Sequence, residues 1–367
     1  MKKALFMPFL RMPSGHHQVA DAIMEYIRRT DSSVICEKAD ILSYSYGNLE
    51  SIVSGFYMKW IHWLPGTYSW MYKKSACRNL HKEKRFHLYE FLFLKHMHKL
   101  ILEKQPNSII CTHCLPSYIA SRLKKLGLLS VPVINAYTDF FINDVWGIRE
   151  IDFHFVPDLH IKQTLLSRGV REEQIVITGI PVHPKITKSN KEQLKPDSLI
   201  TVLITGGSLG AGMMKTLIDK TKPDGKVHYK VLCGKNERLY EELKRLNHSH
   251  ITPLPYMESK EEMNHLYNQV DVILTKPGGV TISECLCKGI PTLVYYTLPG
   301  QEEINLQHLM RLGLVFHWDD WDKGNIEDQI ISMVSENDLE RLKNNIVEYQ
   351  HQFADNDMIS TLRGIIN

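Results

Sequence analysis

Short apolar runs alternate with amphipathic segments along most of the chain. The runs are rich in valine and isoleucine and end at glycine, proline or polar residues, a pattern typical of buried parallel strands. Amphipathic helices follow several of them, for example up to about Arg29 and up to about Arg168. We expect strands at residues 4–10, 34–40, 107–111, 131–137, 153–157, 199–205, 227–233, 251–257, 270–274 and 291–296. This alternation predicts an α/β protein with parallel sheets.

A change in composition divides the chain into two parts. Residues 185–198 are rich in lysine, serine, asparagine and proline, which fits a domain boundary. The length of 367 residues is enough for two domains of ordinary size. We therefore expect one domain at 1–185 and a second at 190–349. The last helix, about 350–367, is expected to cross back onto the first domain.

The turn after residues 270–274 carries the clearest candidate ligand site. Gly278 and Gly279 have no Cβ atoms, so a ligand can approach the backbone closely there. The helix that follows presents free N–H groups and the positive end of its dipole, which favour a phosphate or diphosphate. Glu284 lies one turn into this helix, where a carboxylate can accept hydrogen bonds from a ribose. An ordinary strand-to-helix turn with a glycine pair is the alternative.

A second group of polar side chains follows the next strand, at 291–296. Ligands of parallel sheets bind at the carboxyl ends of strands, so polar residues bunched on such a loop indicate ligand contacts. The residues in question are Gln301, Glu302 and Asn305.

The first strand of the second part, at 199–205, also ends in a glycine-rich turn. This turn contains Gly207, Ser208 and Gly210, and it is close to a dinucleotide-binding fingerprint without matching it. No acidic residue clearly follows at the position that binds the ribose of a nicotinamide cofactor. The sequence therefore disfavours a nicotinamide-dependent enzyme.

Strand ends in the first part carry candidate catalytic groups. His16, preceded by Gly15, lies where the first strand turns into the first helix, so its imidazole is expected to face the crevice above the sheet. Asp139 follows the strand at 131–137 and is a candidate partner for that imidazole. A histidine that merely neighbours a helix cap, and an aspartate that caps a loop, are the alternatives. His113 lies on another strand-end loop, where it is expected to touch an acceptor.

The spacing of Cys111 and Cys114 is that of a metal or redox pair. No second pair of ligands follows at a suitable spacing, so the sequence predicts no zinc site, and a redox dithiol also lacks its usual context. The seven cysteines are scattered and odd in number, which fits a reducing cytosol.

Residues 47–104 combine aromatic side chains with a basic cluster. Aromatic rings at headgroup depth beside cations near anionic lipid are typical of an interfacial membrane contact. The alternative is an aromatic core helix with a solvated basic face. No recognised nucleic-acid motif accompanies the cluster, so no nucleic-acid partner is expected. The candidate membrane residues are Trp60, Trp63, Trp70, Lys73 and Lys74.

Charge and hydropathy exclude several function classes. The net charge of +3 makes no global demand for a nucleic acid. The sequence has no run of about 18 apolar residues, so no transmembrane helix is expected. Pro8 and Arg11 interrupt the first apolar run, which favours a strand over a signal peptide.

Several of these motifs resemble one glycosyltransferase family, which includes the processive diacylglycerol glucosyltransferases of Gram-positive bacteria and plant monogalactosyldiacylglycerol synthase (glycosyltransferase family 28). The resemblance implies the GT-B fold, in which two doubly wound Rossmann-like domains face a central cleft. The first domain would then bind acceptor and membrane, and the second the UDP-sugar. The motifs are Lys276-Pro277-Gly278-Gly279 with Thr281 and Glu284, Pro299-Gly300-Gln301-Glu302 with Asn305, Thr138-Asp139 with Trp146, and Thr178-Gly179-Ile180-Pro181.

The resemblance also implies an activity. It indicates an inverting hexosyltransferase that moves glucose from UDP-glucose to diacylglycerol or its monoglucosyl product, peripherally bound at the cytoplasmic face of the membrane. The UDP-sugar is a substrate, and neither a cofactor nor a metal is expected. His16 would be the base, with Asp139 as its orienter or as an alternative base, and Trp146 would lie near the acceptor. The donor would contact Gly207, Ser208, Gly210, Tyr256, Met257, Gly278, Gly279, Val280, Thr281, Glu284, Gln301, Glu302 and Asn305.

Two departures from the family pattern keep other functions open. Pro13 and Ser14 replace glycines that the family usually has before His16, and Ile148 replaces a histidine of the plant enzymes. A transferase for a polyprenyl-linked or soluble acceptor is one alternative, and a non-enzymatic UDP-sugar sensor is another. The choice of hexose, the processivity and the oligomeric state stay open.

Overall fold

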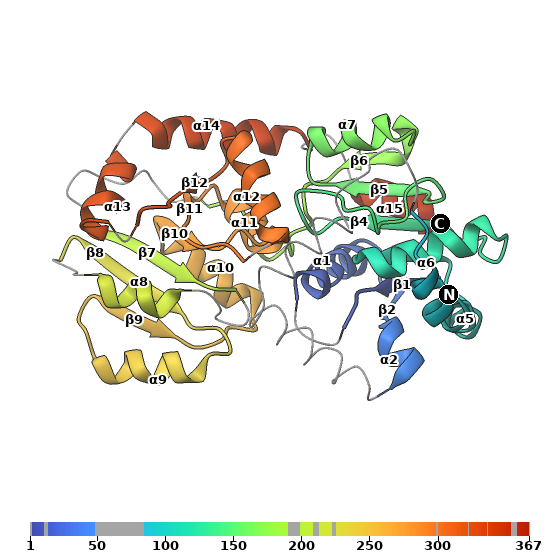
Figure 1. Cartoon of the computed structure of the whole chain (residues 1–367), viewed down its shortest axis with the longest axis horizontal. Coiled ribbons are helices and arrows are strands. Elements are labelled where there is room, and N and C mark those ends of the chain that lie inside the picture. Colours follow the sequence, from blue (N-terminus) through green and yellow to red (C-terminus); the bar gives the residue numbers. More distant parts are fainter. Residues whose placement is uncertain are drawn as a thin grey trace. The chain divides into compact units, whose positions relative to one another are not determined.

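The computed structural model describes residues 2–10, 14–47, 84–189, 199–207, 213–221, 225–298, 300–321, 323–335, 337–353 and 358–366. Figure 1 shows the chain with its helices and strands labelled. The chain divides into two compact units, one formed by Met1–Pro184 with His351–Asn367 and the other by Lys185–Gln350. Each unit is built on one sheet.

The sheet of the first unit is parallel throughout. Its strands are β1 (Lys3–Met7), β2 (Ile35–Lys38), β3 (Ser108–Cys111), β4 (Val133–Ala136), β5 (Phe153–Val156) and β6 (Ile175–Ile177). They lie in the order β2-β1-β3-β4-β5-β6. The helices are α1 (Gly15–Thr30), α2 (Ile41–Tyr46), α5 (His87–Lys104), α6 (Cys114–Lys125), α7 (Leu159–Ser167) and α15 (Met358–Ile366).

The sheet of the second unit is parallel as well. Its strands are β7 (Ile200–Thr205), β8 (Val227–Leu232), β9 (Ile251–Leu254), β10 (Val272–Thr275), β11 (Thr292–Val294) and β12 (Phe316–His317). They lie in the order β12-β11-β10-β7-β8-β9. The helices are α8 (Met214–Lys220), α9 (Glu237–Leu246), α10 (Lys260–Asn268), α11 (Gly279–Lys288), α12 (Gln301–Arg311), α13 (Ile326–Ser335) and α14 (Asn337–His351), the last of which ends at the unit boundary.

The apolar runs that predicted the strands form the two hydrophobic cores. Every residue of β3, β4 and β10 is buried, as expected for strands covered on both faces. Both strand orders reverse direction once, at β1 in the first sheet and at β7 in the second. The α/β, doubly wound prediction is therefore confirmed for each unit.

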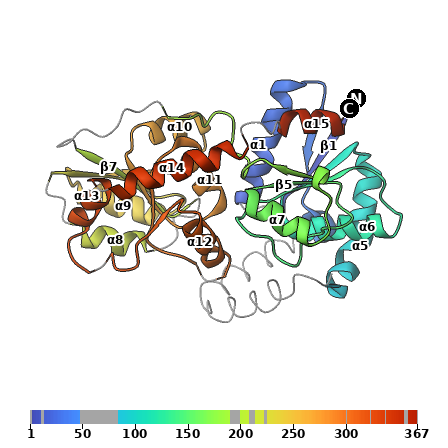
Figure 2. The same ribbon diagram turned by 90° about the horizontal axis from the view of Figure 1, so that it is seen from above.

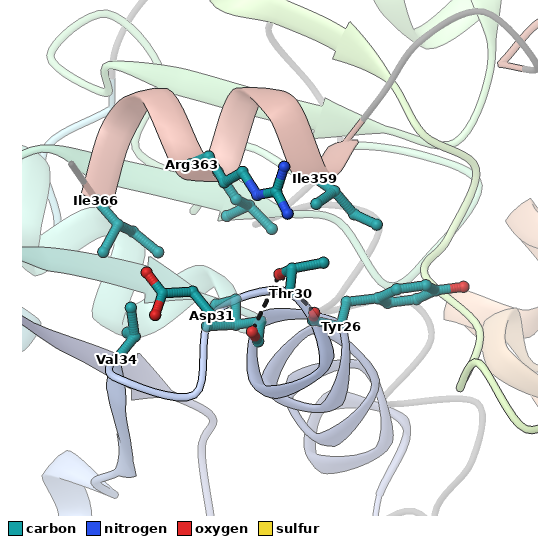
Figure 3. Close-up of a pocket in the computed structure, with 9 residues that line it drawn as sticks. Tyr26, Thr30, Asp31, Val34, Ile359, Arg363 and Ile366 are labelled. Carbon is teal, nitrogen blue, oxygen red and sulfur yellow. Dashed lines mark hydrogen bonds between the residues drawn. The ribbon is translucent and has the colours of Figure 1, made fainter.

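The C-terminal helix α15 packs against α1 at the other end of the sequence (Figure 2). Ile359, Arg363 and Ile366 of α15 lie opposite Tyr26 and Thr30 of α1, and these side chains line one small cavity (Figure 3). The first unit therefore contains residues from both ends of the chain. Among the described residues, no helix is both long and apolar enough to cross a membrane.

Candidate functional site

The two loops that carry His16 and His113 leave the first sheet side by side. Met7 at the end of β1 pairs with Cys111 at the end of β3. The strand order reverses between these two strands, and such a switch point opens a crevice at the carboxyl edge of the sheet. His16 lies in the first turn of α1, and His113 is the N-cap residue of α6.

Backbone and side-chain oxygens hold the imidazole of His16 through one nitrogen. Nδ1 lies 2.8 Å from the carbonyl oxygen of Thr112 and 2.9 Å from the hydroxyl oxygen of Thr138. A carbonyl oxygen only accepts hydrogen bonds, so Nδ1 carries the proton and donates it. In the neutral ring, Nε2 is then left with the lone pair that a general base needs.

The surroundings of His16 also favour the neutral form. Its pKa is lowered to about 4, chiefly by burial and less by the neighbouring charge of His17, while the hydrogen bond to Thr112 acts in the opposite direction. His16 is therefore uncharged at neutral pH, with a free lone pair on Nε2.

His113 is fixed in the same crevice by a helix cap and by two rings. The backbone N–H of Leu115 donates to Nδ1 of His113 over 3.1 Å. Its ring stacks on Phe9 and meets the ring of His16 edge-on, with 4.7 Å between the ring centres in both pairs. Burial, and then the charge of His16, hold the pKa of His113 well below its usual range.

Asp139 directly follows the residue that contacts His16. Thr112 and Thr138 contact Nδ1 of His16, and the orienting role of Asp139 stays a prediction. The carboxylate of Asp139 acts on Cys114, whose thiol pKa is raised to about 12 chiefly by burial and also by this charge. Its role as an alternative base stays a prediction.

Trp146 lies deeper than expected. It belongs to the hydrophobic core of the first unit, where its ring packs edge-on against Tyr137 with 4.6 Å between ring centres. Trp146 therefore packs in the core, and its place near the acceptor stays a prediction. Ile148 also packs against this core, and Gly15 begins α1 directly before His16.

In the second unit, two glycine turns meet at the equivalent reversal of strand order. Leu274 of β10 pairs with Ile204 of β7, so the turns after both strands are neighbours. Gly207 has φ +74°, a conformation that favours glycine, and a Cβ atom there would lie only 3.3 Å from Cε of Lys276. The glycine turn after β7 therefore lies directly against Lys276, which begins the glycine turn after β10.

The second turn leads into a helix that no side chain caps. The N-cap residue of α11 is Gly278, which has no side chain to close the first turn. The first helical turn of α11 includes Gly279, Val280 and Thr281. Its backbone N–H groups point out of the start of the helix, where an anion is favoured. The predicted order of strand, glycine turn and helix is confirmed here.

Glu284 is more enclosed than the ribose hypothesis requires. It is only 4% exposed, and both carboxylate oxygens have partners within α10. Lys260 donates to Oε1 and the hydroxyl of Tyr267 donates to Oε2, each over 2.8 Å. The side chain of Glu284 is thus held by α10, and its ribose-binding role stays a prediction.

Residues near the start of α12 bind this helix to the glycine turn after β10. Glu302 forms an ion pair with Lys276 and accepts the backbone N–H of Leu298 over 2.8 Å. Asn305 is buried and donates to the carbonyl oxygen of Pro277 over 3.2 Å, and its contact with a sugar stays a prediction. Gln301, half-buried at the first position of α12, stays a candidate sugar contact.

The remaining candidate donor contacts follow β9. Tyr256 and Met257 are half-buried after the carboxyl end of that strand. The ammonium group of Lys235, which follows β8, lies 5.4 Å from the ring centre of Tyr256. Seven predicted site residues lie outside the described residues, namely Trp60, Trp63, Trp70, Lys73, Lys74, Ser208 and Gly210.

Sequence reasoning missed the partners of the predicted residues. Thr112 acts through its backbone, which no side-chain pattern reveals. Thr138 and Lys276 stood within recognised motifs but received no role, although a lysine beside a glycine turn is a plausible phosphate ligand. Lys260 lies far from Glu284 in sequence and becomes its neighbour only through the packing of α10 on α11.

The described residues offer no metal site of three or more histidine, cysteine or acidic side chains. The thiols of Cys111 and Cys114 are held protonated, because burial raises the pKa of both.

Acid is expected to destabilise the first unit in a defined pH window. Burial lowers the pKa of His16 to about 4, that of His154 to about 3, and that of His113 well below its usual range. The unfolded chain binds these protons near pH 6.5, and the folded chain binds them only at lower pH. The free energy of unfolding should therefore fall as pH drops from about 6.5 towards about 4, by about 1.4 kcal/mol per pH unit for each such histidine.

Urea unfolding at a series of pH values measures this slope. His154→Gln should lower this slope by the contribution of about one proton taken up on unfolding, because His154 is fully buried and lies outside the crevice. A slope that this substitution leaves unchanged would contradict the assignment.

Comparison with known proteins gives the same family for both halves of the chain. Residues 16–182 match the family model of monogalactosyldiacylglycerol (MGDG) synthase, and residues 201–355 match that of the glycosyltransferase family 28 C-terminal domain. The chain is 42% identical to the uncharacterized glycosyltransferase YkoN of Bacillus subtilis, over 100% of this chain and 98% of the relative. It is 29% identical to a processive diacylglycerol beta-glucosyltransferase of Bacillus cereus, over 82% of this chain and 78% of the relative.

Solved structures support the fold. MurG of Acinetobacter baumannii superposes with a TM-score of 0.61 at 13% identity, covering 99% of both chains. The glycosyltransferase of kitacinnamycin superposes with the same TM-score at 12% identity, covering 100% of this chain and 99% of the other. The chain therefore belongs to glycosyltransferase family 28, and it is an enzyme of the hexosyltransferase type with the GT-B fold.

Proposed function

We propose that this enzyme transfers a hexose, with glucose as the expected sugar, from a UDP-sugar to diacylglycerol or monoglycosyldiacylglycerol with inversion at the anomeric carbon. The reaction would take place at the cytoplasmic face of the membrane. The observation that carries the proposal is the state of His16, whose imidazole is neutral, fixed through Nδ1 and unprotonated at Nε2.

The proposed reaction is a single displacement. Nε2 of His16 takes the proton of the acceptor hydroxyl while its oxygen bonds to the anomeric carbon and the bond from that carbon to UDP breaks. Attack from the face opposite to UDP inverts the anomeric centre. The negative charge that grows on UDP would be met by the N–H groups at the start of α11 and by Lys276.

A lipid acceptor is supported by the relatives and by the outer face of α5. The relative from Bacillus cereus is named for its action on diacylglycerol, and the matching N-terminal family model for the synthesis of a galactolipid. One face of α5 packs in the core through Phe93 and Met97. The opposite face exposes 65% of Leu88 and 85% of Phe91, in line with the exposed Lys95 and Lys99. Apolar side chains among cations suit an anionic bilayer surface.

Replacing Leu88 and Phe91 with serine is expected to weaken binding to vesicles of phosphatidylcholine and phosphatidylglycerol by about tenfold or more, because about 1.5–3 kcal/mol of burial is lost for each large apolar side chain. Flotation measures the bound fraction. Leu246→Ser is the matched control, since Leu246 is 57% exposed on α9 of the other unit. Equal binding by the double variant and the control would exclude this face of α5 as the lipid contact.

UDP release tests the function itself. UDP-glucose, UDP-galactose and UDP-N-acetylglucosamine are each supplied with and without vesicles that contain diacylglycerol. Release that requires one donor and the vesicles supports the proposal and identifies the sugar. Release that is independent of lipid would point to a soluble acceptor, and absence of release with all three donors would overturn the proposed substrates.

A further inference from the structure

Resting on the proposed function, we propose that His113 is a second catalytic residue, which donates a hydrogen bond from Nε2 to the oxygen of the same acceptor hydroxyl that His16 deprotonates. The two imidazoles would then bind one hydroxyl group between them. Its hydrogen would go to His16, and its oxygen would accept from His113.

The helix cap determines which nitrogen of His113 carries the proton. The backbone N–H of Leu115 donates to Nδ1 over 3.1 Å, as part of the cap of α6. A ring nitrogen that accepts a hydrogen bond has no proton, so the neutral ring carries its proton on Nε2. Because burial lowers its pKa, His113 is neutral at pH 7 and has this single N–H group to donate.

His16 has the opposite tautomer. Its Nδ1 donates to the carbonyl oxygen of Thr112, which leaves Nε2 as the acceptor. The two rings lie edge to face, 4.7 Å apart between centres. Two neighbouring rings therefore offer one nitrogen that only accepts and one that only donates, and a hydroxyl group needs one of each. A carboxylate, which has no proton at neutral pH, would bring its negative charge against the lone pair of His16 and would bind less well.

Both tautomers depend on backbone groups of one turn. Thr112 and Leu115 flank His113 at the end of β3, and each binds the Nδ1 atom of one ring. Phe9 stacks on His113 from the loop after β1, which restricts rotation of its ring. The pair is thus arranged before an acceptor arrives, so little reorganisation remains for the reaction.

The proposed contact would act while the proton moves. As Nε2 of His16 takes the hydroxyl proton, negative charge grows on the acceptor oxygen before its bond to the anomeric carbon is complete. The N–H group of His113 would stabilise this charge and hold the oxygen in line for attack. His113 keeps its own proton throughout, and UDP leaves with the bonding electrons of the donor.

Substitution by asparagine separates this role from helix capping. Asparagine is a favoured N-cap residue, so His113→Asn can still accept the N–H of Leu115 but is too short to place a donor where Nε2 lies. We expect His113→Asn to keep the melting temperature and the KM for the UDP-sugar, and to lower kcat by about 10²-fold. His113→Ala should lose thermal stability as well. If His113→Asn has the kcat of the wild type, His113 serves only as a helix cap and the inference is overturned.

Histidine ¹⁵N chemical shifts test the tautomers without relying on turnover. His16 is expected to be protonated at Nδ1 and His113 at Nε2 at pH 7, with signals assigned from His16→Gln and His113→Asn. The same tautomer in both rings would overturn the inference even if the wild type turns over. If the tautomers are as expected but the wild type releases no UDP with any donor, the proposed substrates fail instead.

Discussion

Replacing His16 with glutamine is expected to lower kcat by about 10³-fold, within the range that loss of a general base usually produces. Glutamine retains a polar side chain of similar length, but its amide is far too weak a base to take the hydroxyl proton. The KM for the UDP-sugar should change little, because His16 belongs to the first unit and the predicted donor contacts belong to the second. UDP release with vesicles and the expected donor measures both constants.

The neighbouring histidine provides the control for this substitution. Nε2 of His17 contacts the carbonyl oxygen of Leu10, away from Thr112, so His17→Gln should retain most of the activity. The pH dependence of kcat/KM gives a second test in the wild type. Because burial lowers the pKa of His16 to about 4, the activity should persist well below pH 6.5 and should fall only as the pH approaches about 4. An acid limb centred near pH 6.5 would contradict the environment described for His16.

Replacing Lys276 with methionine is expected to lower kcat/KM for the UDP-sugar by about 10²-fold. The substitution removes a cation beside both glycine turns, and a hydrogen bond to a charged group is typically worth about 1.5–3 kcal/mol. It also leaves the carboxylate of Glu302, most of which is buried, without its ion-pair partner. Steady-state kinetics and thermal unfolding together measure the two effects.

A double variant separates these two causes. Adding Glu302→Gln removes the carboxylate charge that Lys276→Met leaves unpaired, and the glutamine keeps an oxygen that can accept the N–H of Leu298. If Lys276 acts on the diphosphate, the double variant stays as slow as Lys276→Met. If the loss arises from the unpaired carboxylate, the double variant recovers activity. Activity of Lys276→Met close to that of the wild type would exclude a role for this lysine in donor binding.

The sequence predicted the architecture well, because local patterns determine it. Runs such as residues 107–111 and 270–274 are short and mostly apolar, which favours strands that are covered on both faces. Two strands were not predicted. Strand β6 lies within a run that was interpreted only as a motif, and β12 has two half-buried residues and no apolar pattern of its own. Glycine at Gly278 and at Gly207 marked the strand-end turns correctly.

The environment of each site residue was harder to predict, because it depends on residues distant in the sequence. Nothing near Glu284 indicates that Lys260 and Tyr267 cover its carboxylate. Trp146 and Asn305 were candidate contacts because they belong to motifs of the family, and the sequence did not show that tertiary packing buries both side chains. The orientation of His16 by a backbone carbonyl group leaves no trace in side-chain identities at all.

The packing of α15 on α1 has a consequence for synthesis of the chain. The whole second unit, Lys185–Gln350, is made after the first sheet and before the helix that completes the first unit. The second unit can therefore fold on the ribosome while α1 still lacks one of its apolar neighbours. Contacts between residues so distant in sequence form slowly. The unit that carries the proposed base should thus be the last to reach its native state and the more dependent on chaperones in the cell.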